Sequence, residues 1–337
     1  MGWCTTSDLD RFLAAAGGYL RSRAAEHTLL LTATQAACDA QVGASRDAPR
    51  NAPGNVMPSA SAARQAGAAA RATPGGDGLL FGWWEPPDGS DPRGAFMHDQ
   101  ASPVLLAARA PETAAALAGA LARTGRGVCG VDALTGAADA FAAAWSQRAG
   151  VTVRVHRHSR VYRLAGTAPN QMGPAGRYRV ATWADRALLV EWLRAFGAEV
   201  GELTSAPEAD ADDLLGYGGA AFWEADGQPT AMATVTRLVA GTVRLNTVYT
   251  PPQWRHNGYA TAVMLAVSRA ALSGQANEMV LITDRNSPER QAARLGYQLI
   301  GERAVLRFGP PTAPMPRLQT GPMARVRTTG PMPRLRG

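Results

Sequence analysis

The stretch that decides the fold is residues 248–261, which read Val248-Tyr249-Thr250-Pro251-Pro252-Gln253-Trp254-Arg255-His256-Asn257-Gly258-Tyr259-Ala260-Thr261. A β-strand is expected to end at the paired prolines, and a short loop and an amphipathic helix are expected to follow. The helix is indicated by apolar residues at helical spacing, namely Ala260, Val263, Met264 and Val267. This order favours phosphate binding, because the first N–H groups of a helix lack partners within it and carry partial positive charge.

Single residues in this loop fit the same interpretation. Gly258 lets the backbone approach an anion closely, Ala260 leaves the first helical turn uncrowded, and Arg255 adds a fixed positive charge suited to phosphate. A glycine-containing loop is a weak signal by itself. The residues alone therefore leave open whether the loop binds phosphate or only connects a strand to a helix.

The rest of the second half predicts alternating strands and helices. A strand contains Tyr178 and Val180, and a helix that begins at Ala184 carries its apolar residues at helical spacing up to Phe196. The Asp226-Gly227 pair predicts a hairpin turn. Strands are expected over 232–238, 242–250, 280–282 and 297–308, with helices after the second and third of these. The expected order is β-α-α-β-β-β-α-β-α-β.

The first half shows similar but weaker patterns. A helix is expected to begin near Asp8, a strand to contain Trp83 and Trp84, and alanine-rich helices to begin near Pro111 and Gly136. Residues 151, 153 and 155 are valines that alternate as in a strand.

The second half resembles the GNAT superfamily of N-acetyltransferases. The segment from Arg255 to Ala260 matches the family's acyl-CoA loop, Arg/Gln-x-x-Gly-x-Gly/Ala, and Thr283-Asp284 and Leu295-Gly296-Tyr297 resemble its later acyl-CoA segment. The resemblance implies an α/β (α+β) fold with a mixed central sheet flanked by helices. It also implies acetyl-CoA as cosubstrate, bound by the residues Val248, Tyr249, Thr250, Arg255, His256, Asn257, Gly258, Tyr259, Ala260, Thr261 and Asn286.

Domain boundaries follow from this resemblance and from composition. Residues 1–160 are interpreted as a degenerate GNAT-like domain that lacks the acyl-CoA loop, and residues 175–308 as the GNAT N-acetyltransferase domain. An insertion at about 41–78 and an Arg/Pro-rich tail at 309–337 are expected to be disordered, since they contain too few large apolar residues to offset the entropy of ordering.

The distribution of charge and the spacing of cysteines limit which kinds of partner, namely nucleic acid or metal, we expect. The net charge is +7, of which the tail contributes +5 and the insertion +2, so the remaining residues are near neutral. We therefore expect no specific nucleic-acid partner, although a protein that acts on nucleic acid through its arginine-rich tail is the competing interpretation. Three scattered cysteines and five histidines give no metal-ligand spacing, and no apolar run reaches the roughly 18 residues of a membrane span. A cytoplasmic protein without metal or membrane contact is expected.

The resemblance implies transfer of an acetyl group to a primary amine of a small molecule or protein, by direct attack in a ternary complex. Glu199 and Glu202 resemble residues on the family's substrate side and are the candidate carboxylates for deprotonation, although solvated surface glutamates would look the same. Ala292 stands where the family commonly has a tyrosine that protonates the leaving thiolate, and Tyr297 is expected to pack inside. A non-catalytic acyl-CoA-binding regulatory module is the alternative, and the identity of the acceptor stays open.

Overall fold

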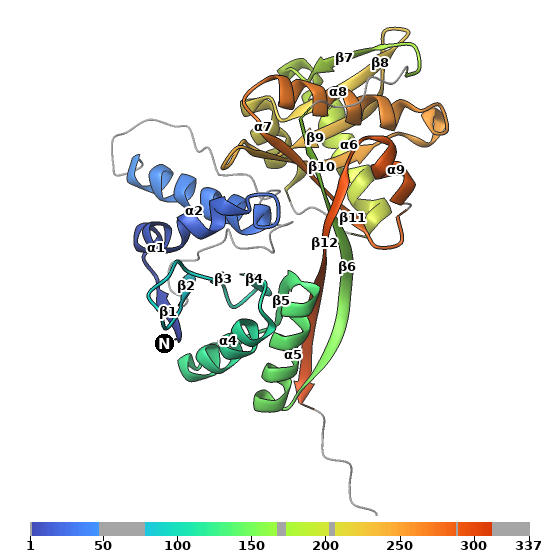
Figure 1. Ribbon diagram of the computed structural model, residues 1–337. Helices are drawn as coiled ribbons and strands as arrows, with labels where there is room; N and C mark the ends of the chain where they lie inside the picture. The colour runs from blue at the N-terminus through green and yellow to red at the C-terminus, as the bar shows by residue number, and fades with distance from the viewer. Residues whose placement is uncertain (1, 47–77, 167–172, 202–205, 288, 312–337) are drawn as a thin grey trace, which may run out of the picture.

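The structure is a computed structural model that describes residues 2–46, 78–166, 173–201, 206–287 and 289–311. The strands form one 12-stranded mixed sheet in the order β1-β2-β3-β4-β5-β12-β6-β11-β10-β9-β8-β7. Helices cover both faces of this sheet, and the two longest strands, β6 and β12, join the two ends of the molecule (Figure 1). The expected mixed α/β architecture is confirmed.

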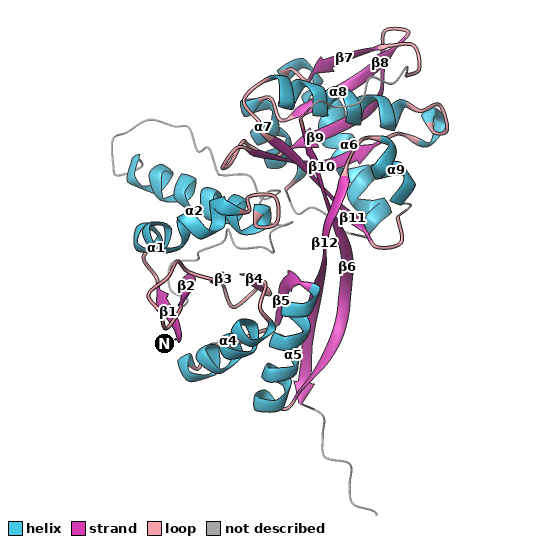
Figure 2. Cartoon of the chain, viewed as in Figure 1, coloured by secondary structure: helices cyan, strands magenta, loops and turns pink. Residues whose placement is uncertain are grey.

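The two halves of the chain repeat one order of elements. The first half contains β1 (Gly2–Thr6), α1 (Leu9–Ser22), α2 (Thr28–Arg46), β2 (Leu80–Glu85), β3 (Gly94–His98), β4 (Val104–Ala108), α4 (Pro111–Thr124), β5 (Gly130–Leu134), α5 (Thr135–Ala149) and β6 (Val151–Ala165). The second contains β7 (Arg177–Val180), α6 (Arg186–Val200), α7 (Pro207–Tyr217), β8 (Ala220–Ala225), β9 (Gln228–Val235), β10 (Thr242–Tyr249), α8 (Tyr259–Ser273), β11 (Glu278–Asp284), α9 (Glu289–Arg294) and β12 (Gln298–Pro311). Two short 3-10 helices, η1 (Trp183–Asp185) and η2 (Pro252–Trp254), precede α6 and α8. Over the residues that the structure describes, each half therefore runs β-α-α-β-β-β-α-β-α-β, and Figure 2 shows the alternation.

The halves exchange their last strands. β12 pairs antiparallel with β5 from Arg303↔Leu134 to Arg307↔Gly130, so the end of the second half extends the sheet of the first. β6 pairs antiparallel with β11 from Ser159↔Asp284 to Ala165↔Glu278, so the end of the first half extends the sheet of the second. β6 and β12 also pair with each other, which fuses both sheets into one.

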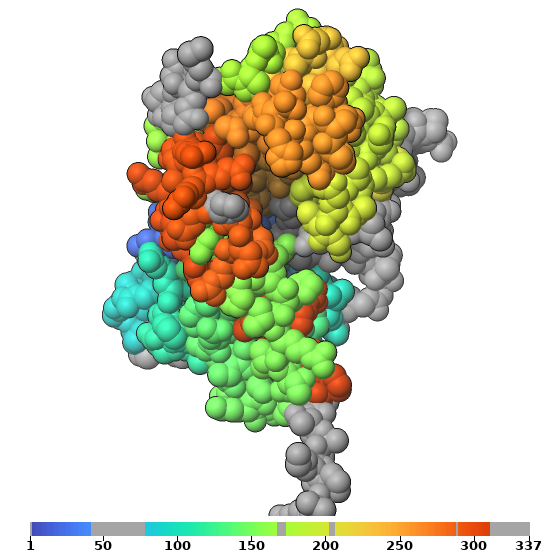
Figure 3. Space-filling model, turned by 90° about the vertical axis from the view of Figure 1, so that its right-hand side faces the viewer, coloured from blue at the N-terminus to red at the C-terminus, as the bar shows by residue number. Residues whose placement is uncertain are grey.

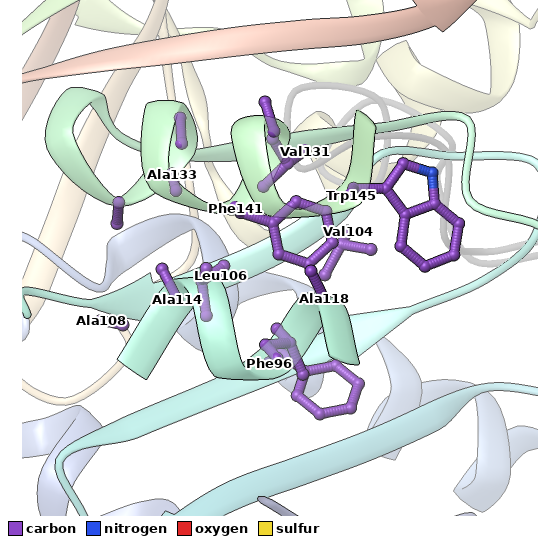
Figure 4. Packing of buried hydrophobic residues seen from close by; sticks show 14 of the residues in the cluster. Phe96, Val104, Leu106, Ala108, Ala114, Ala118, Val131, Ala133, Phe141 and Trp145 are labelled. Atoms are coloured by element: carbon purple, nitrogen blue, oxygen red, sulfur yellow. The ribbon is translucent and has the colours of Figure 1, made fainter. Parts of the chain in front are cut away.

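Alternating side chains along each strand build two separate layers in the first half. In β4, Val104 and Leu106 pack under α4 and α5, whereas Leu105 and Ala107 pack under α1 and α2. The alanine-rich faces of α4 and α5 approach closely around the fully buried ring of Phe141 (Figure 4). Truncating a buried phenylalanine to alanine typically costs about 3–5 kcal/mol, so this ring is a main support of the layer.

The second half has the same two layers. α6 and α7 pack on Phe222, Met232 and Tyr249, and α8 and α9 pack on the opposite face with residues such as Leu245 and Leu281. The helix α2 of the first half reaches this half too, because its cluster includes Ile282 of β11. The centre of the sheet is thus covered by helices from both halves.

Several elements differ from the sequence-based expectations. β1, β4, β5 and α2 were not expected, and α2 continues to Arg46, inside the expected insertion. β6 extends to Ala165 and β12 to Pro311, beyond the expected ends at 160 and 308. Residues 47–77 and 312–337, which hold most of the expected disordered segments, lie outside the described residues. The domain boundaries stay a prediction.

Candidate acyl-CoA and acceptor site

A parallel strand pair diverges at the centre of the second half. β10 pairs with β11 from Thr242↔Glu278 to Leu245↔Leu281. Beyond this point β10 follows β9, with a register shift between Leu245 and Thr247, and β11 follows β6 to Asp284. Divergence leaves one edge of β10 available to an extended ligand, because the backbone groups on that edge face no neighbouring strand.

The loop after β10 presents an open helix start. Gly258 is the N-cap of α8, has a φ of +80° and offers no side chain to cap the helix. The first helical hydrogen bond runs from the N–H of Ala262 to the carbonyl of Gly258 at 3.0 Å. The N–H groups of residues 259–261 therefore lie at the free end of the helix, where partial positive charge favours an anion.

Hydrogen bonds hold the loop that leads to this helix. The Arg255 Nε donates to the carbonyl of Thr250 at 2.9 Å, and its Nη2 donates to Oε1 of Glu199 at 2.5 Å. The amide of Asn257 donates to the carbonyls of Trp254 and Arg255. His256 also has a left-handed backbone, with φ +66°, so the chain turns sharply within the loop. Arg255 thus links the loop to the end of α6.

The remaining residues expected to bind the cofactor differ in what they can offer. Tyr249 is buried and packs edge-on against Trp192 at 5.9 Å between ring centroids, so its side chain belongs to the core. Val248 also packs its side chain in the core, and the Thr250 Oγ1 is buried without a hydrogen-bond partner among the described residues. Asn286 is exposed after β11, and its backbone N–H donates to Oδ1 of Asp284 at 2.8 Å. At 248 and 249 the side chains pack into the protein, so only the backbone groups are left to contact a ligand.

A pocket of about 250 Å³ lies where β10 and β11 diverge. Its lining comes from both halves of the chain: Leu29, Asp132, Arg157, Ser159, Phe196, Val200, Asn246, Ile282, Thr283, Asp284, Arg303 and Val305. Figure 3 shows a hollow on this side, between the yellow-green segment that contains α6 and the orange and red segments around it. A ligand that follows the diverging strands from the loop would end in this pocket.

Charged side chains are buried around the pocket. Arg303 donates from Nη2 and Nε to Oδ1 of Asp132 at 2.7 and 3.2 Å, and both side chains are over nine-tenths buried. Arg244 of β10 is 1% exposed, and its Nη1 lies 3.5 Å from Oγ1 of Thr32 on α2. Its Nε and Nη2 are buried without a hydrogen-bond partner among the described residues. Burial, and secondly the charge of Arg303, lower the pKa of Arg244 to about 10.

The candidate catalytic residues lie in different places. Glu199 pairs with Arg255 rather than lining the pocket, although Phe196 and Val200 on the same turn of α6 do line it. Glu202 lies outside the described residues. Asn246 was not predicted from the sequence, where the one signal for it was an amide side chain within an expected strand.

Position 292 holds an alanine where the family commonly has a tyrosine, and Tyr297 does not take over its place. Ala292 is buried in the core under α8. Tyr297 is 3% exposed, its hydroxyl lies 3.0 Å from Oγ of Ser268, and burial raises its pKa to about 12. The expectation that Tyr297 packs inside is confirmed.

The equivalent position in the first half cannot hold an anion in the same way. Only Arg109 and Ala110 connect β4 to α4, and α4 begins with Pro111 and Glu112. Proline lacks the N–H that an anion would bind, and a carboxylate in the first turn repels it. The first half therefore repeats the order of elements but lacks the anion-binding helix start that the second half has at α8.

Residues 179–297, in the second half of the chain, match the model of the acetyltransferase (GNAT) family. A search of curated proteins found no match.

Solved structures are similar to this chain at low sequence identity, and one of them, from Drosophila, shares its fold. A protein from Drosophila is 15% identical over 92% of this chain and 99% of its own, with a TM-score of 0.59. A GCN5-related N-acetyltransferase from Sphaerobacter thermophilus is 16% identical over 69% of this chain and 82% of its own, with a TM-score of 0.48. A tandem GNAT protein from the clavulanic acid biosynthesis pathway is 15% identical over 93% and 99%, with a TM-score of 0.42.

The described residues show neither a membrane-spanning helix nor a metal site. Within the described ranges, no helix is long and apolar enough to cross a membrane. Among those same residues, no group of three or more His, Cys, Asp or Glu side chains could hold a metal ion.

Proposed function

We propose that this protein transfers the acetyl group of acetyl-CoA to a primary amine of a small molecule or protein, by direct attack in a ternary complex. The observation that carries the proposal is the pocket at the point where β10 and β11 diverge, in a half of the chain that also presents the open start of α8. A thioester laid along the diverging strand would present its carbonyl to whatever amine occupies that pocket.

The cosubstrate would be held mainly by backbone groups. The N–H groups of residues 259–261 would bind the pyrophosphate, and Arg255 would add a positive charge beside it. The backbone of Val248 and Thr250 would bind the pantetheine arm, since the Val248 side chain packs in the core. Asn286 would approach the cofactor from the end of β11.

The reaction requires the loss of one proton from the amine. The nitrogen lone pair attacks the carbonyl carbon, the new C–N bond forms, and the C–S bond breaks with its electrons on sulfur. We propose that a carboxylate at the end of α6, Glu199 or Glu202, accepts the ammonium proton, and that Asp284 at the pocket is a further candidate. Water would protonate the leaving thiolate, because Ala292 offers no hydroxyl.

The test is thiol release from acetyl-CoA in the presence of a broad panel of amines, with mass analysis of the acetylated product. Release above the rate without acceptor, together with an amide product, supports the proposal. Tight binding of CoA by calorimetry without turnover of any amine would instead support a non-catalytic acyl-CoA-binding regulatory module, which Ala292 favours.

A further inference from the structure

The feature that the proposed reaction leaves unexplained is the excess of positive charge behind the pocket. Asp132 and Arg303 neutralise each other within the lining. Arg244 has no carboxylate partner, and its contact with Thr32 leaves two guanidinium nitrogens buried and without hydrogen bonds among the described residues. A buried cation is normally paired, since leaving it unpaired is costly.

The position of Arg244 relates this charge to the pocket. Arg244 precedes Asn246 by two residues on β10, and Asn246 lines the pocket. Thr32, which Arg244 contacts, lies three residues after Leu29 on α2, and Leu29 lines the pocket as well. Residues three apart on a helix share a face. Arg303 and Asp132 both line the pocket, and both lie near enough to Arg244 to influence its charge. Arg244 therefore lies close behind the pocket lining, against α2.

The pocket also offers acceptors of hydrogen bonds. The Asn246 Oδ1 is buried without a partner among the described residues, and Asp284 lines the pocket at the free end of β11. An ammonium group donates to such oxygens. The pocket thus combines a cation, Arg303 with Arg244 behind it, with acceptor oxygens on the diverging strands.

We propose that the acceptor is a small amino acid, whose carboxylate is held on the side of Arg303 and Arg244 and whose amine faces Asn246 and Asp284. This inference rests on the proposed acetyl transfer and names its acceptor class. A volume of about 250 Å³ lies just below the usual range for drug-sized ligands, which suits a molecule of this size better than a protein side chain with its backbone. The product is an N-acetyl amino acid, and the atoms exchanged are those of the proposed reaction.

The first experiment compares acceptors that differ only in the carboxylate. Glycine is measured against glycinamide, and leucine against leucinamide and 3-methylbutylamine, by initial rates of thiol release. We expect kcat/KM to be about 10- to 100-fold higher for the acids, where each factor of ten corresponds to about 1.4 kcal/mol. Equal or better use of the amides overturns the inference while leaving acetyl transfer intact.

The second experiment uses variants. Arg244→Met keeps the size of the side chain and removes its charge, and we expect the preference for acids to fall about 10-fold or more while amides are used as before. Arg244→Lys should retain part of the preference. Arg163→Met, on β6 and 44% exposed in a weak pair with Glu278, is the control and should change neither.

The melting temperature of Arg244→Met tells whether Arg244 binds the acceptor or only supports the fold. Removing an unpaired buried charge should leave the melting temperature of Arg244→Met equal to or above that of the wild type. A lower melting temperature with equal losses for acids and amides would show that Arg244 only supports the fold, and would overturn the inference.

A binding measurement covers the case in which no amine is acetylated. In that case, calorimetry measures the binding of leucine to the CoA-bound protein, and the binding of leucinamide is measured for comparison. Binding of leucine alone supports the pocket's specificity even though the transfer reaction has failed, and absence of leucine binding overturns the inference.

Discussion

A negative charge at the N-cap of α8 should abolish tight CoA binding without unfolding the protein. Gly258 has a φ of +80°, and a β-carbon there would lie 3.7 Å from Cδ of Pro174, an ordinary contact. Gly258→Asn and Gly258→Asp therefore add nearly the same shape and the same backbone strain, about 1–2 kcal/mol at most for a side chain in this conformation. The two variants differ by one negative charge.

The size of the charge effect follows from Coulomb's law. At about 5 Å, two unit charges in bulk water repel by about 0.8 kcal/mol, and a pyrophosphate carries about two of them. The minimum loss is then about 1.7 kcal/mol, or roughly 15-fold in Kd, and a lower local dielectric would increase it. A negative charge at a helix start stabilises the helix by about 0.3–1 kcal/mol, so stability and CoA affinity should move in opposite directions between Asn and Asp.

Calorimetry of CoA binding at low and high salt is the assay, with thermal melts in parallel. Gly150→Asp is the matched control, since Gly150 ends α5 with a φ of +67° and open space around its β-carbon. It should lose stability without losing CoA affinity. If Gly258→Asp binds CoA as tightly as Gly258→Asn at low salt, the assignment of the pyrophosphate to this helix start is wrong.

Three further predictions concern catalysis and stability. Glu199→Gln should lower kcat at least about 100-fold if this carboxylate accepts the proton; a change confined to the KM of acetyl-CoA would show that it acts only through Arg255. Tyr297→Phe should keep most of the activity, because that hydroxyl is buried away from the pocket; complete loss of turnover would refute water as the proton donor. Asp185 accepts two hydrogen bonds from Arg179, at 2.7 and 2.8 Å, and its pKa is lowered to about 2. The lowered pKa means that ionised Asp185 adds at most about 2 kcal/mol to the free energy of unfolding above pH 4, and that this contribution is lost as the pH falls toward 2. In Asp185→Asn, the free energy of unfolding measured with urea should therefore change less between pH 4 and pH 2 than in the wild type.

The sequence predicted the second half well because short local patterns mark where its strands and helices begin and end. Asp226-Gly227 marks one hairpin, the paired prolines end β10, and helical spacing marks α6 and α8. In the first half, β4 was missed because a short continuous apolar run does not distinguish a buried strand from a helix, and β5 was missed because it is short and interrupted by Asp132. The rest of the predicted order of strands and helices came from the resemblance to the GNAT superfamily.

The pocket could not be predicted because its residues come together only through strand exchange. Asp132 and Arg303 are 171 positions apart, and only the pairing of β5 with β12 brings them together. No periodic pattern encodes a pairing at that distance. A local signal did exist in Arg244 and Asn246, a charge and an amide within a buried strand, and such residues can be sought in related sequences.

The exchange of β6 and β12 also governs how the chain can fold. β12 is the last described strand to leave the ribosome, yet it must insert between β5 and β6, which are made much earlier. Until it arrives, both of those strands expose unpaired edges, the state in which polypeptides aggregate or pair with other copies. Neither half can complete its sheet before β12 has been made, so folding depends on slow, distant contacts.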